Sequence, residues 1–182
     1  NIRNMNKGLK FLLFLAVYLL SFNDAWAQGA LLSGPNQVVV QGNYAYVVSD
    51  GSDALEVVDI SYPQLPAHAG ALGGLFSNIF SFDIVGDYAY IGNYSQNSLE
   101  IVDVSDPFNP ILVNTINSGD NGMNLSRIDS VKVSGIYLFV ASRSVQYVEI
   151  LDISDPVHPF RLSLISTGSL QQPFSIFVSG NY

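Results

Sequence analysis

Residues 86–110 read GDYAYIGNYSQNSLEIVDVSDPFNP, and this block occurs three times with fixed internal spacing. In each copy an aspartate follows the first glycine by 17 residues, and a proline follows it by 24. A fourth copy begins at the end of the chain. Repetition of this kind is typical of stacked supersecondary units, so it predicts the architecture. The repeated residues are Gly42, Asp59 and Pro66; Gly86, Asp103 and Pro110; Gly135, Asp152 and Pro159; and, in the fourth copy, Gly180.

The spacing from one glycine to the next varies, in contrast, and takes the values 44, 49 and 45. All of this variation lies after the second proline, and the longest version is Asn117–Arg127. Insertions survive where a chain runs over the surface, so the fixed part is predicted to be the scaffold and the variable part a surface loop. Recognition is usually placed on such loops, which makes Asn117–Arg127 the favoured functional segment.

Each copy predicts four β-strands. The segment before the glycine has apolar residues at alternate positions, and an aromatic segment follows the glycine. The third segment is almost continuously aliphatic, which predicts a strand covered on both faces. A fourth segment begins after the second proline and suits an edge strand. The last three segments are predicted at 44–48, 55–60 and 67–72; at 88–91, 99–104 and 111–116; and at 137–141, 148–153 and 160–165, while Ile176 and Val178 begin the same pattern in the fourth copy.

Four antiparallel strands in about 45 residues match one blade of a β-propeller, for which repeats of ~40–50 residues are typical. Blades stack face to face, so both sides of each sheet must be apolar. We therefore predict an all-β fold: a β-propeller of four-stranded antiparallel blades, here a partial ring of about three blades plus the start of a fourth. A sandwich or a β-solenoid is the alternative. The predicted copies span about 34–78, 79–126, 127–173 and, incomplete, 174–182.

The aliphatic runs carry a resemblance to a known family. LEVVDIS (55–61), LEIVDVSDP (99–107) and VEILDISDP (148–156) are similar to the LVIVD repeat, a β-propeller-type repeat of cell-surface and secreted prokaryotic proteins. The first copy has Tyr62-Pro63 where the others have Asp-Pro, which leaves the form of its turn open. The resemblance implies the propeller fold but assigns no catalytic residue.

The N-terminal region has the pattern of a secretory signal peptide. From Met5 onward, Lys7 and Lys10 form a basic segment, an apolar core runs over 11–20, and Ala25-Trp26-Ala27 is a small-x-small cleavage site. We expect cleavage after Ala27, which leaves residues 28–182 as the mature chain. This chain is expected to be secreted or to stay in the cell envelope, either in the periplasm or at the cell surface. An uncleaved membrane anchor is the alternative, although the apolar core is shorter than the ~20 residues of a membrane span.

Charge and cysteine content restrict the function classes. Beyond Ala27 the chain has 4 basic and 14 acidic residues, which gives this part a formal charge of −10. An acidic surface argues against binding nucleic acid, and against docking to anionic lipid. The chain has no cysteine, which excludes disulfides, a thiol nucleophile, a cysteine-ligated metal and a lipidated cysteine.

Candidate chemical residues mostly have structural interpretations. Asp59, Asp103 and Asp152 are expected in mid-strand, accepting hydrogen bonds from turn amides rather than forming a catalytic dyad. The repeated glycines are expected in tight hairpins that need a positive φ. The loops Ser49–Asp53 and Asp120–Asn124 are rich in oxygen ligands and leave a calcium site open as an alternative to turns. His68 and His158 lie at different repeat positions, so no ligand pair or general base is predicted.

The predicted function is a secreted or cell-surface, non-catalytic binding module or scaffold with an unidentified protein or carbohydrate partner. No catalytic, cofactor or metal residue is assigned. Two alternatives stay open: an exported propeller hydrolase or lyase with its site at the central channel, and a calcium-dependent adhesion protein. An enzyme is expected to break the repeat symmetry with polar residues facing the channel. In the sequence alone, the clear break is Asn117–Arg127.

Overall fold

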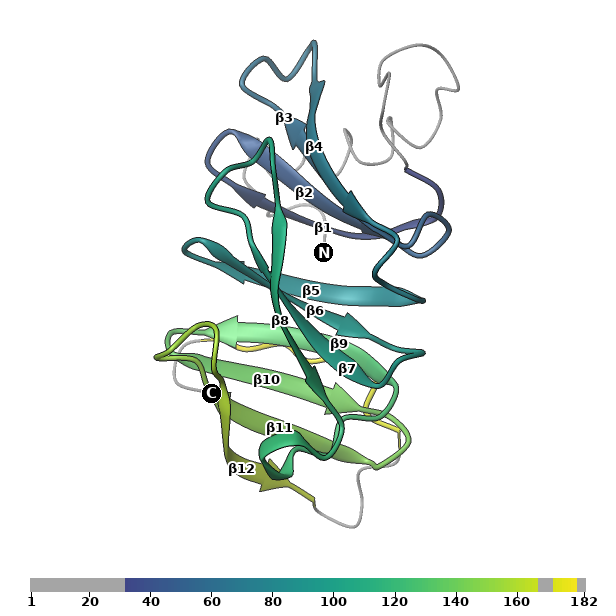
Figure 1. The fold of residues 1–182 in the computed structure, drawn as a ribbon, viewed down its shortest axis with the longest axis vertical. Helices are drawn as coiled ribbons and strands as arrows, with labels where there is room; N and C mark the ends of the chain where they lie inside the picture. Colours follow the sequence, from purple (N-terminus) through teal and green to yellow (C-terminus); the bar gives the residue numbers. More distant parts are fainter. Residues whose placement is uncertain (1–31, 167–171, 180–182) are drawn as a thin grey trace.

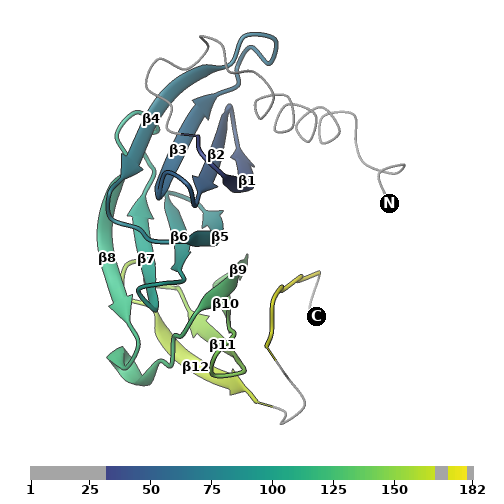
Figure 2. The same ribbon diagram turned by 90° about the vertical axis from the view of Figure 1, so that its right-hand side faces the viewer.

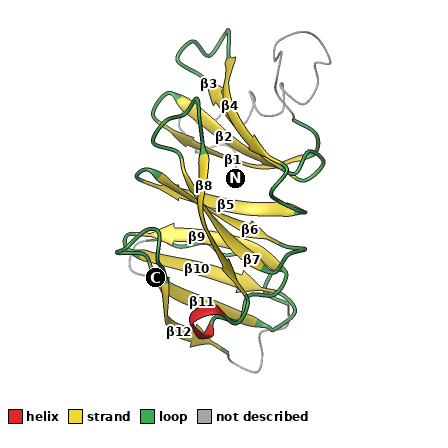
Figure 3. Cartoon of the chain, viewed as in Figure 1, coloured by secondary structure: helices red, strands yellow, loops and turns green. Residues whose placement is uncertain are grey.

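The computed structural model of the chain describes residues 32–166 and 172–179. The predicted signal peptide and Gly180 lie outside these residues. Twelve strands form three four-stranded antiparallel sheets, each built from strands consecutive in the chain (Figure 3). The strands are β1 (Pro35–Gln41), β2 (Tyr44–Ser49), β3 (Ala54–Asp59) and β4 (Ala67–Gly73); β5 (Ile79–Val85), β6 (Tyr88–Asn93), β7 (Ser98–Asp103) and β8 (Ile111–Asn117); and β9 (Ile128–Ser134), β10 (Tyr137–Ser142), β11 (Tyr147–Asp152) and β12 (Phe160–Ile165).

The three sheets stack as blades in an open arc (Figures 1 and 2). In each sheet the first strand of the copy lies on the concave side and the fourth strand lies at the outer rim. The predicted fold is therefore confirmed: the chain forms three blades of a β-propeller, and the ring they form is not closed. The first strands, β1, β5 and β9, surround the propeller axis.

The hairpin between the first two strands of each blade is made by the repeated glycine. Gly42, Gly86 and Gly135 have φ of 58°, 58° and 60°. Each is the first residue of a two-residue loop, because Gln41 pairs with Tyr44 and the other copies pair alike. Such a loop favours glycine at this position, since other residues are strained at positive φ. The prediction is confirmed for these three glycines.

The blades are held together by two apolar cores, one in each space between neighbouring sheets. The core between the first and second blades includes Leu55, Phe82 and Ile91, and the core between the second and third includes Leu99, Ile101 and Leu138, all fully buried. Side chains alternate across a strand, so the middle blade supplies both cores from opposite faces. This is why the aliphatic third strand of a copy is apolar in almost every position.

The aspartates of the aliphatic runs end their strands and do not lie in mid-strand, which corrects the prediction. Each strand stops at Asp59, Asp103 or Asp152, one residue earlier than the aliphatic pattern indicates. The reason is local: the carboxylate accepts a hydrogen bond from the backbone N–H two residues later, at 2.8, 2.8 and 2.7 Å. This bond turns the chain, as the turn interpretation of these residues predicts.

The proline turns that follow have one form in all three copies. The N–H of Leu65 donates to the Tyr62 carbonyl oxygen at 2.7 Å, and the same bond joins Asn109 to Asp106 at 3.1 Å. The third copy repeats it at 3.3 Å. Tyr62 therefore keeps the backbone bond of the turn, but it lacks the carboxylate that accepts the Phe108 N–H at Asp106 and the Val157 N–H at Asp155. The strands after the prolines are the outermost of their sheets, as predicted.

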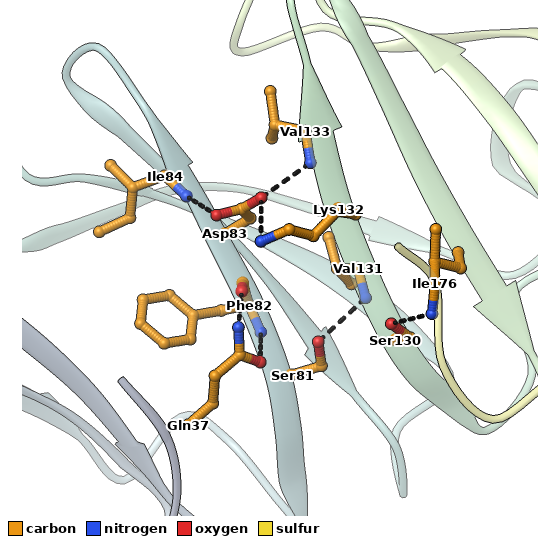
Figure 4. A network of polar contacts seen from close by, with 10 residues as sticks. All are labelled: Gln37, Ser81, Phe82, Asp83, Ile84, Ser130, Val131, Lys132, Val133 and Ile176. Atoms are coloured by element: carbon orange, nitrogen blue, oxygen red, sulfur yellow. Dashed lines mark hydrogen bonds and ion pairs between the residues drawn. The ribbon is translucent and has the colours of Figure 1, made fainter. Parts of the chain in front are cut away.

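The inner strands β5 and β9 each have a free edge that side chains of the preceding blade satisfy (Figure 4). Each inner strand pairs with only one neighbour in its own sheet, so half of its backbone groups point toward the axis. In β5, the Gln37 side chain donates to the Phe82 carbonyl oxygen at 2.8 Å and accepts from the Phe82 N–H at 3.2 Å. Gln41 donates to the Gly86 carbonyl oxygen at 2.8 Å.

The same arrangement recurs at the next inner strand. The Ser81 hydroxyl accepts from the Val131 N–H at 3.0 Å, and Asp83 accepts from the Val133 N–H at 2.9 Å. Gln37 and Ser81 are both five residues before the repeated glycine. A polar side chain at this position therefore joins each blade to the next one.

The fourth copy continues this chain of contacts without forming a strand. Ile176 and Val178 were predicted to begin one, but the described residues 172–179 contain no strand. The Ile176 N–H nevertheless donates to the Ser130 hydroxyl at 3.0 Å, and Ser130 is also five residues before its glycine. The Ile176 N–H thus bonds to the third blade in the same way as the Val131 N–H bonds to the second. No described strand pairs with the segment 172–179.

Replacing Ser81 with alanine tests the contact between the blades. Ser81→Ala leaves the buried Val131 N–H without an acceptor, so we expect the free energy of unfolding to fall by about 1–3 kcal/mol. Chemical denaturation measures this change. Ser144→Ala is the matched control because Ser144 is exposed and no hydrogen bond of its hydroxyl is seen. Equal stability of the two variants would contradict the proposed role of the Ser81 hydroxyl.

The strand-ending aspartates make stability depend on pH. Hydrogen bonds from the Ser154 side chain and backbone hold the pKa of Asp152 below its usual value. A lowered pKa in the folded state stabilises the fold above about pH 4, the pKa of an unfolded aspartate, and the effect is lost as the pH falls further. Asp152→Ala is therefore expected to lower the melting temperature at pH 7 and to match the parent protein at the acid end of a pH series.

Asp87→Ala is the control for this experiment. Asp87 occupies a hairpin position that holds Asn43 and Ile136 in the other copies, so a carboxylate is not needed there. A pH-independent difference between Asp152→Ala and the parent protein would show that the carboxylate is not the stabilising group.

Candidate functional site

A cavity of about 670 Å³ opens at the propeller axis, at the end where the inner strands begin. Its walls come from β1, β5, β9 and the segment 172–179, with residues just beyond β6 and β10. The volume is within the range of ~300–1,000 Å³ that small-molecule sites occupy. The lining residues are Asn36, Gln37, Asn78, Phe80, Ser81, Tyr94, Asp129, Ser130, Val131, Lys132, Arg143, Phe174, Ser175 and Ile176.

An ion pair with two hydrogen bonds lies in this wall. Arg143 Nε donates to Asp129 Oδ2 at 2.6 Å, and Arg143 Nη2 donates to Asp129 Oδ1 at 2.9 Å. Asp129 is 8% exposed, and burial raises the pKa of its carboxyl while the bonds from Arg143 oppose that rise. The two residues meet because β9 and β10 are antiparallel neighbours whose register shifts at Ala141/Ser142. The pairing fixes the plane of the guanidinium.

Aromatic rings surround the guanidinium. The Arg143 Cζ lies 5.1 Å from the centre of the Phe174 ring and 6.0 Å from that of Tyr94. Arg127 lies over Tyr94 at 5.7 Å, and Phe80 meets Tyr94 edge to face at 5.2 Å. These contacts are within the ~6 Å range of cation–π attraction. They bring together residues from two blades and from the fourth copy.

A second ion pair lies along the inner strands. Lys132 Nζ is 2.9 Å from Asp83 Oδ2, which also accepts the Val133 N–H (Figure 4). The other oxygen, Oδ1, accepts the Ile84 N–H at 3.1 Å. Asp83 is therefore occupied in joining the blades, while Lys132 stays partly exposed in the cavity wall.

The cavity is where the repeat symmetry breaks. Six residues before the repeated glycine the copies have Asn36, Phe80, Asp129 and Phe174, and eight residues after it they have Asp50, Tyr94 and Arg143. Aligning the copies position by position reveals these differences in the sequence. They indicate a functional site, because a scaffold alone does not require them. The expectation that the symmetry breaks clearly only in Asn117–Arg127 is therefore wrong.

The long loop Asn117–Arg127 packs mainly into the scaffold. It contains the short 3-10 turn η2 (Asp120–Gly122), and its Met123 and Leu125 are 2% and 0% exposed in the core between the second and third blades. The Asn124 N–H donates to the buried Glu149 at 2.9 Å. The loop thus fills the space between two blades. At the site, Arg127 lies over Tyr94, and its carbonyl oxygen accepts the Arg143 N–H at 3.1 Å.

The two oxygen-rich loops use their carboxylates in hydrogen bonds. Asp53 Oδ1 accepts the Asn78 N–H of the next blade at 2.9 Å, and Asp120 Oδ2 accepts the Asn117 N–H at 2.9 Å. Within residues 32–166 and 172–179, no three His, Asp or Glu side chains converge as a metal site requires. Calcium binding stays a prediction.

The histidines lie apart, as their unequal repeat positions indicate. His68 Nε2 is 3.2 Å from Glu56 in the first blade, while the exposed His158 is 3.1 Å from Asp155 in a turn of the third. The side chain of His158 lowers the pKa of the Asp155 carboxyl. Neither histidine lines the cavity.

A buried glutamate in every blade has a role that the sequence patterns did not reveal. Glu56, Glu100 and Glu149 are at most 2% exposed and occupy the same position of the third strand. Glu100 accepts from the hydroxyls of Ser98, at 2.7 Å, and of Thr115, and Glu149 pairs with Arg161 at 3.3 Å. A glutamate that recurs at one position of each aliphatic run could have indicated this buried role in the sequence. These groups stand outside the cavity, where they bond within their blades and, through Glu149, to the loop before the third blade.

Solved structures share this fold. The chain superposes on hydrazine synthase from Kuenenia stuttgartiensis with a TM-score of 0.62 and 16% identity, covering 83% of this chain and 42% of that one. The periplasmic gluconolactonase of Pseudomonas aeruginosa superposes with a TM-score of 0.61 and 13% identity, covering 78% of this chain and 41% of that one. A Bacteroides uniformis protein provisionally assigned as a 6-phosphogluconolactonase superposes with a TM-score of 0.66 and 16% identity, covering 81% of this chain and 48% of that one. At these identities the likeness concerns the fold alone.

This chain thus spans less than half the length of each of these three proteins. The comparison with curated proteins finds no match. No helix within the described residues is long and apolar enough to cross a membrane.

The family is shown by the repeats themselves. The model of the LVIVD repeat matches three times, at residues 35–71, 81–118 and 127–165. The three matches coincide with the three blades and together cover more than half of the chain. The chain therefore belongs to the LVIVD repeat family.

Proposed function

We propose that this protein is an exported, non-catalytic binding module that holds a small polar ligand in the cavity at the propeller axis. The observation that carries the proposal is the clustering of non-repeated residues in that cavity. The scaffold positions recur from blade to blade, whereas Asp129 and Arg143 have no equivalent in the other copies. These residues line a cavity at positions where the copies differ. Binding of a ligand is the best explanation for such differences.

The chemistry of the wall supports a ligand with both polar and apolar parts. Asn36 and Asn78 are exposed amides at the rim, and Phe174 exposes 68% of its surface there. The ion pair between Asp129 and Arg143 is braced by Tyr94, so it offers a preorganised polar group at little entropic cost. The signal-peptide pattern before residue 28 supports export to the cell envelope or beyond.

Thermal shift with a panel of sugars tests the proposal. We expect at least one of glucose, galactose, their uronic acids or the corresponding disaccharides to raise the melting temperature in a saturable way, because a ligand that binds only the folded state stabilises it by ~2.7 kcal/mol at 100 times its Kd. Phe174→Ala removes the ring at the rim and is expected to weaken binding about 10-fold, or ~1.4 kcal/mol.

Phe177→Ala is the matched control, because Phe177 lies on the same segment, is 86% exposed and does not line the cavity. A panel without any stabilising compound would contradict the proposal. Conversion of the bound compound to a product, followed by NMR, would contradict it as well and favour an exported propeller hydrolase or lyase.

A further inference from the structure

Three of the four basic residues beyond residue 27 gather at one place. Beyond residue 27 the chain has four basic side chains, Arg127, Lys132, Arg143 and Arg161, against 14 acidic ones. Lys132 and Arg143 line the axial cavity, and Arg127 lies over the ring of Tyr94, which lines it too. The fourth, Arg161, pairs with Glu149 in the third blade.

The balance of charge at the cavity is positive. Its lining residues include two cations, Lys132 and Arg143, and one carboxylate, Asp129. Outside the lining, the neighbours Arg127, Asp83 and Asp53 add one cation and two carboxylates. The excess positive charge therefore belongs to the cavity wall itself, and in a protein whose formal charge is −8 such a wall favours a ligand that carries a single negative charge.

Arg143 has the geometry to bind that charge. Its Nε and Nη2 donate to Asp129, while no described residue accepts a bond from Nη1. The edge formed by Nη1 and the second N–H of Nη2 therefore faces away from Asp129. Two parallel N–H groups of a guanidinium match the two oxygens of a carboxylate. The Phe174 and Tyr94 rings hold the guanidinium in position for such a contact.

The rest of the wall suits the remainder of a sugar acid. The side-chain nitrogens of Asn36 and Asn78 already donate to the Ile79 carbonyl oxygen and to the Ser95 hydroxyl, at 2.9 and 2.6 Å. Their amide oxygens and the hydroxyl of Ser175 can accept bonds from ligand hydroxyls, and the exposed face of Phe174 can cover an apolar ring face. A single fork with one excess charge fits a carboxylate better than a phosphate dianion.

We propose that the axial cavity binds a carboxylate-bearing sugar of the uronic acid class, with its carboxylate on the Nη1/Nη2 edge of Arg143. This assignment rests on the proposed function, since it names the ligand class of the same site. Arg143 is then the residue that decides between acidic and neutral sugars.

Calorimetry with the purified protein tests the assignment. The probes are glucuronate and galacturonate, with their methyl esters as uncharged compounds of nearly the same shape. At least one acid is expected to bind about 10-fold or more tightly than its ester, because a charge-assisted bidentate contact is lost on esterification. The affinity for the acid is expected to fall as salt is added, because salt screens the attraction.

Arg143→Lys keeps the charge but removes the fork, so the preference for the acid is expected to shrink while the ester binds as before. Asp129→Asn/Arg143→Gln removes both charges with little change of shape and avoids an unpaired buried carboxylate; it is expected to abolish the preference. Arg161→Lys is the matched control and is expected to keep it. Circular dichroism melts confirm that each variant is folded.

Three outcomes would overturn the assignment. If acid and ester bind equally, or if inorganic phosphate binds as tightly as the acids, the cavity is not a sugar-acid site, although the proposed binding function stands. If Arg143→Lys retains the full preference, Arg143 is not the recognising group. If none of the sugars or sugar acids binds, both the assignment and the proposed function fail.

Discussion

The structure depends on the hydrogen bonds that cross from one inner strand to the next at the propeller axis. Every inner strand has a free edge, and an unpaired backbone group on such an edge is costly when it is buried. Gln37 satisfies the edge of β5, Ser81 satisfies that of β9, and Ser130 bonds the segment that contains Ile176. Apolar packing alone tolerates sliding of one blade over the next, whereas these directional bonds set one position. The angle between blades, and so the curvature of the arc, follows from them.

This constraint also explains where the candidate site lies. The bond that recurs between blades uses the position five residues before the glycine, Asp83 adds one from three residues before it, and the hairpin uses the glycine itself. At the start of the inner strand the copies differ: Asn36 donates to the Ile79 carbonyl oxygen of the next blade, whereas Asp129 bonds to Arg143, which lies just beyond the second strand of its own blade. These positions are held rigidly by the scaffold but are free to differ between copies. A site built there gains a fixed geometry and a variable chemistry.

Much of the fold could be predicted because its determinants are local. The hairpin at Gly42 and the turn bond of Asp59 involve neighbours within a few residues, so fixed spacing in the sequence reveals them. The stacking of blades followed from the aliphatic third strand. The site could not be predicted in the same way. Its Arg143 reaches Asp129 through a register shift, and Phe174 reaches Arg143 only because the fourth copy returns to the axis. Such contacts depend on how blades are placed in space, which no spacing within one copy specifies.

Hydrogen exchange at the Val131 amide tests the account most directly. This amide belongs to the inner strand β9 but points away from β10, its only partner among the described strands, and the Ser81 hydroxyl is its acceptor. NMR-detected exchange is predicted to show protection of Val131 in the parent protein and a large loss of protection in Ser81→Ala, while Phe82, which bonds to Gln37, keeps its rate. Exchange of Val131 at the rate of an unpaired amide in the parent protein, or no change in Ser81→Ala, would contradict the claim that these bonds join the blades.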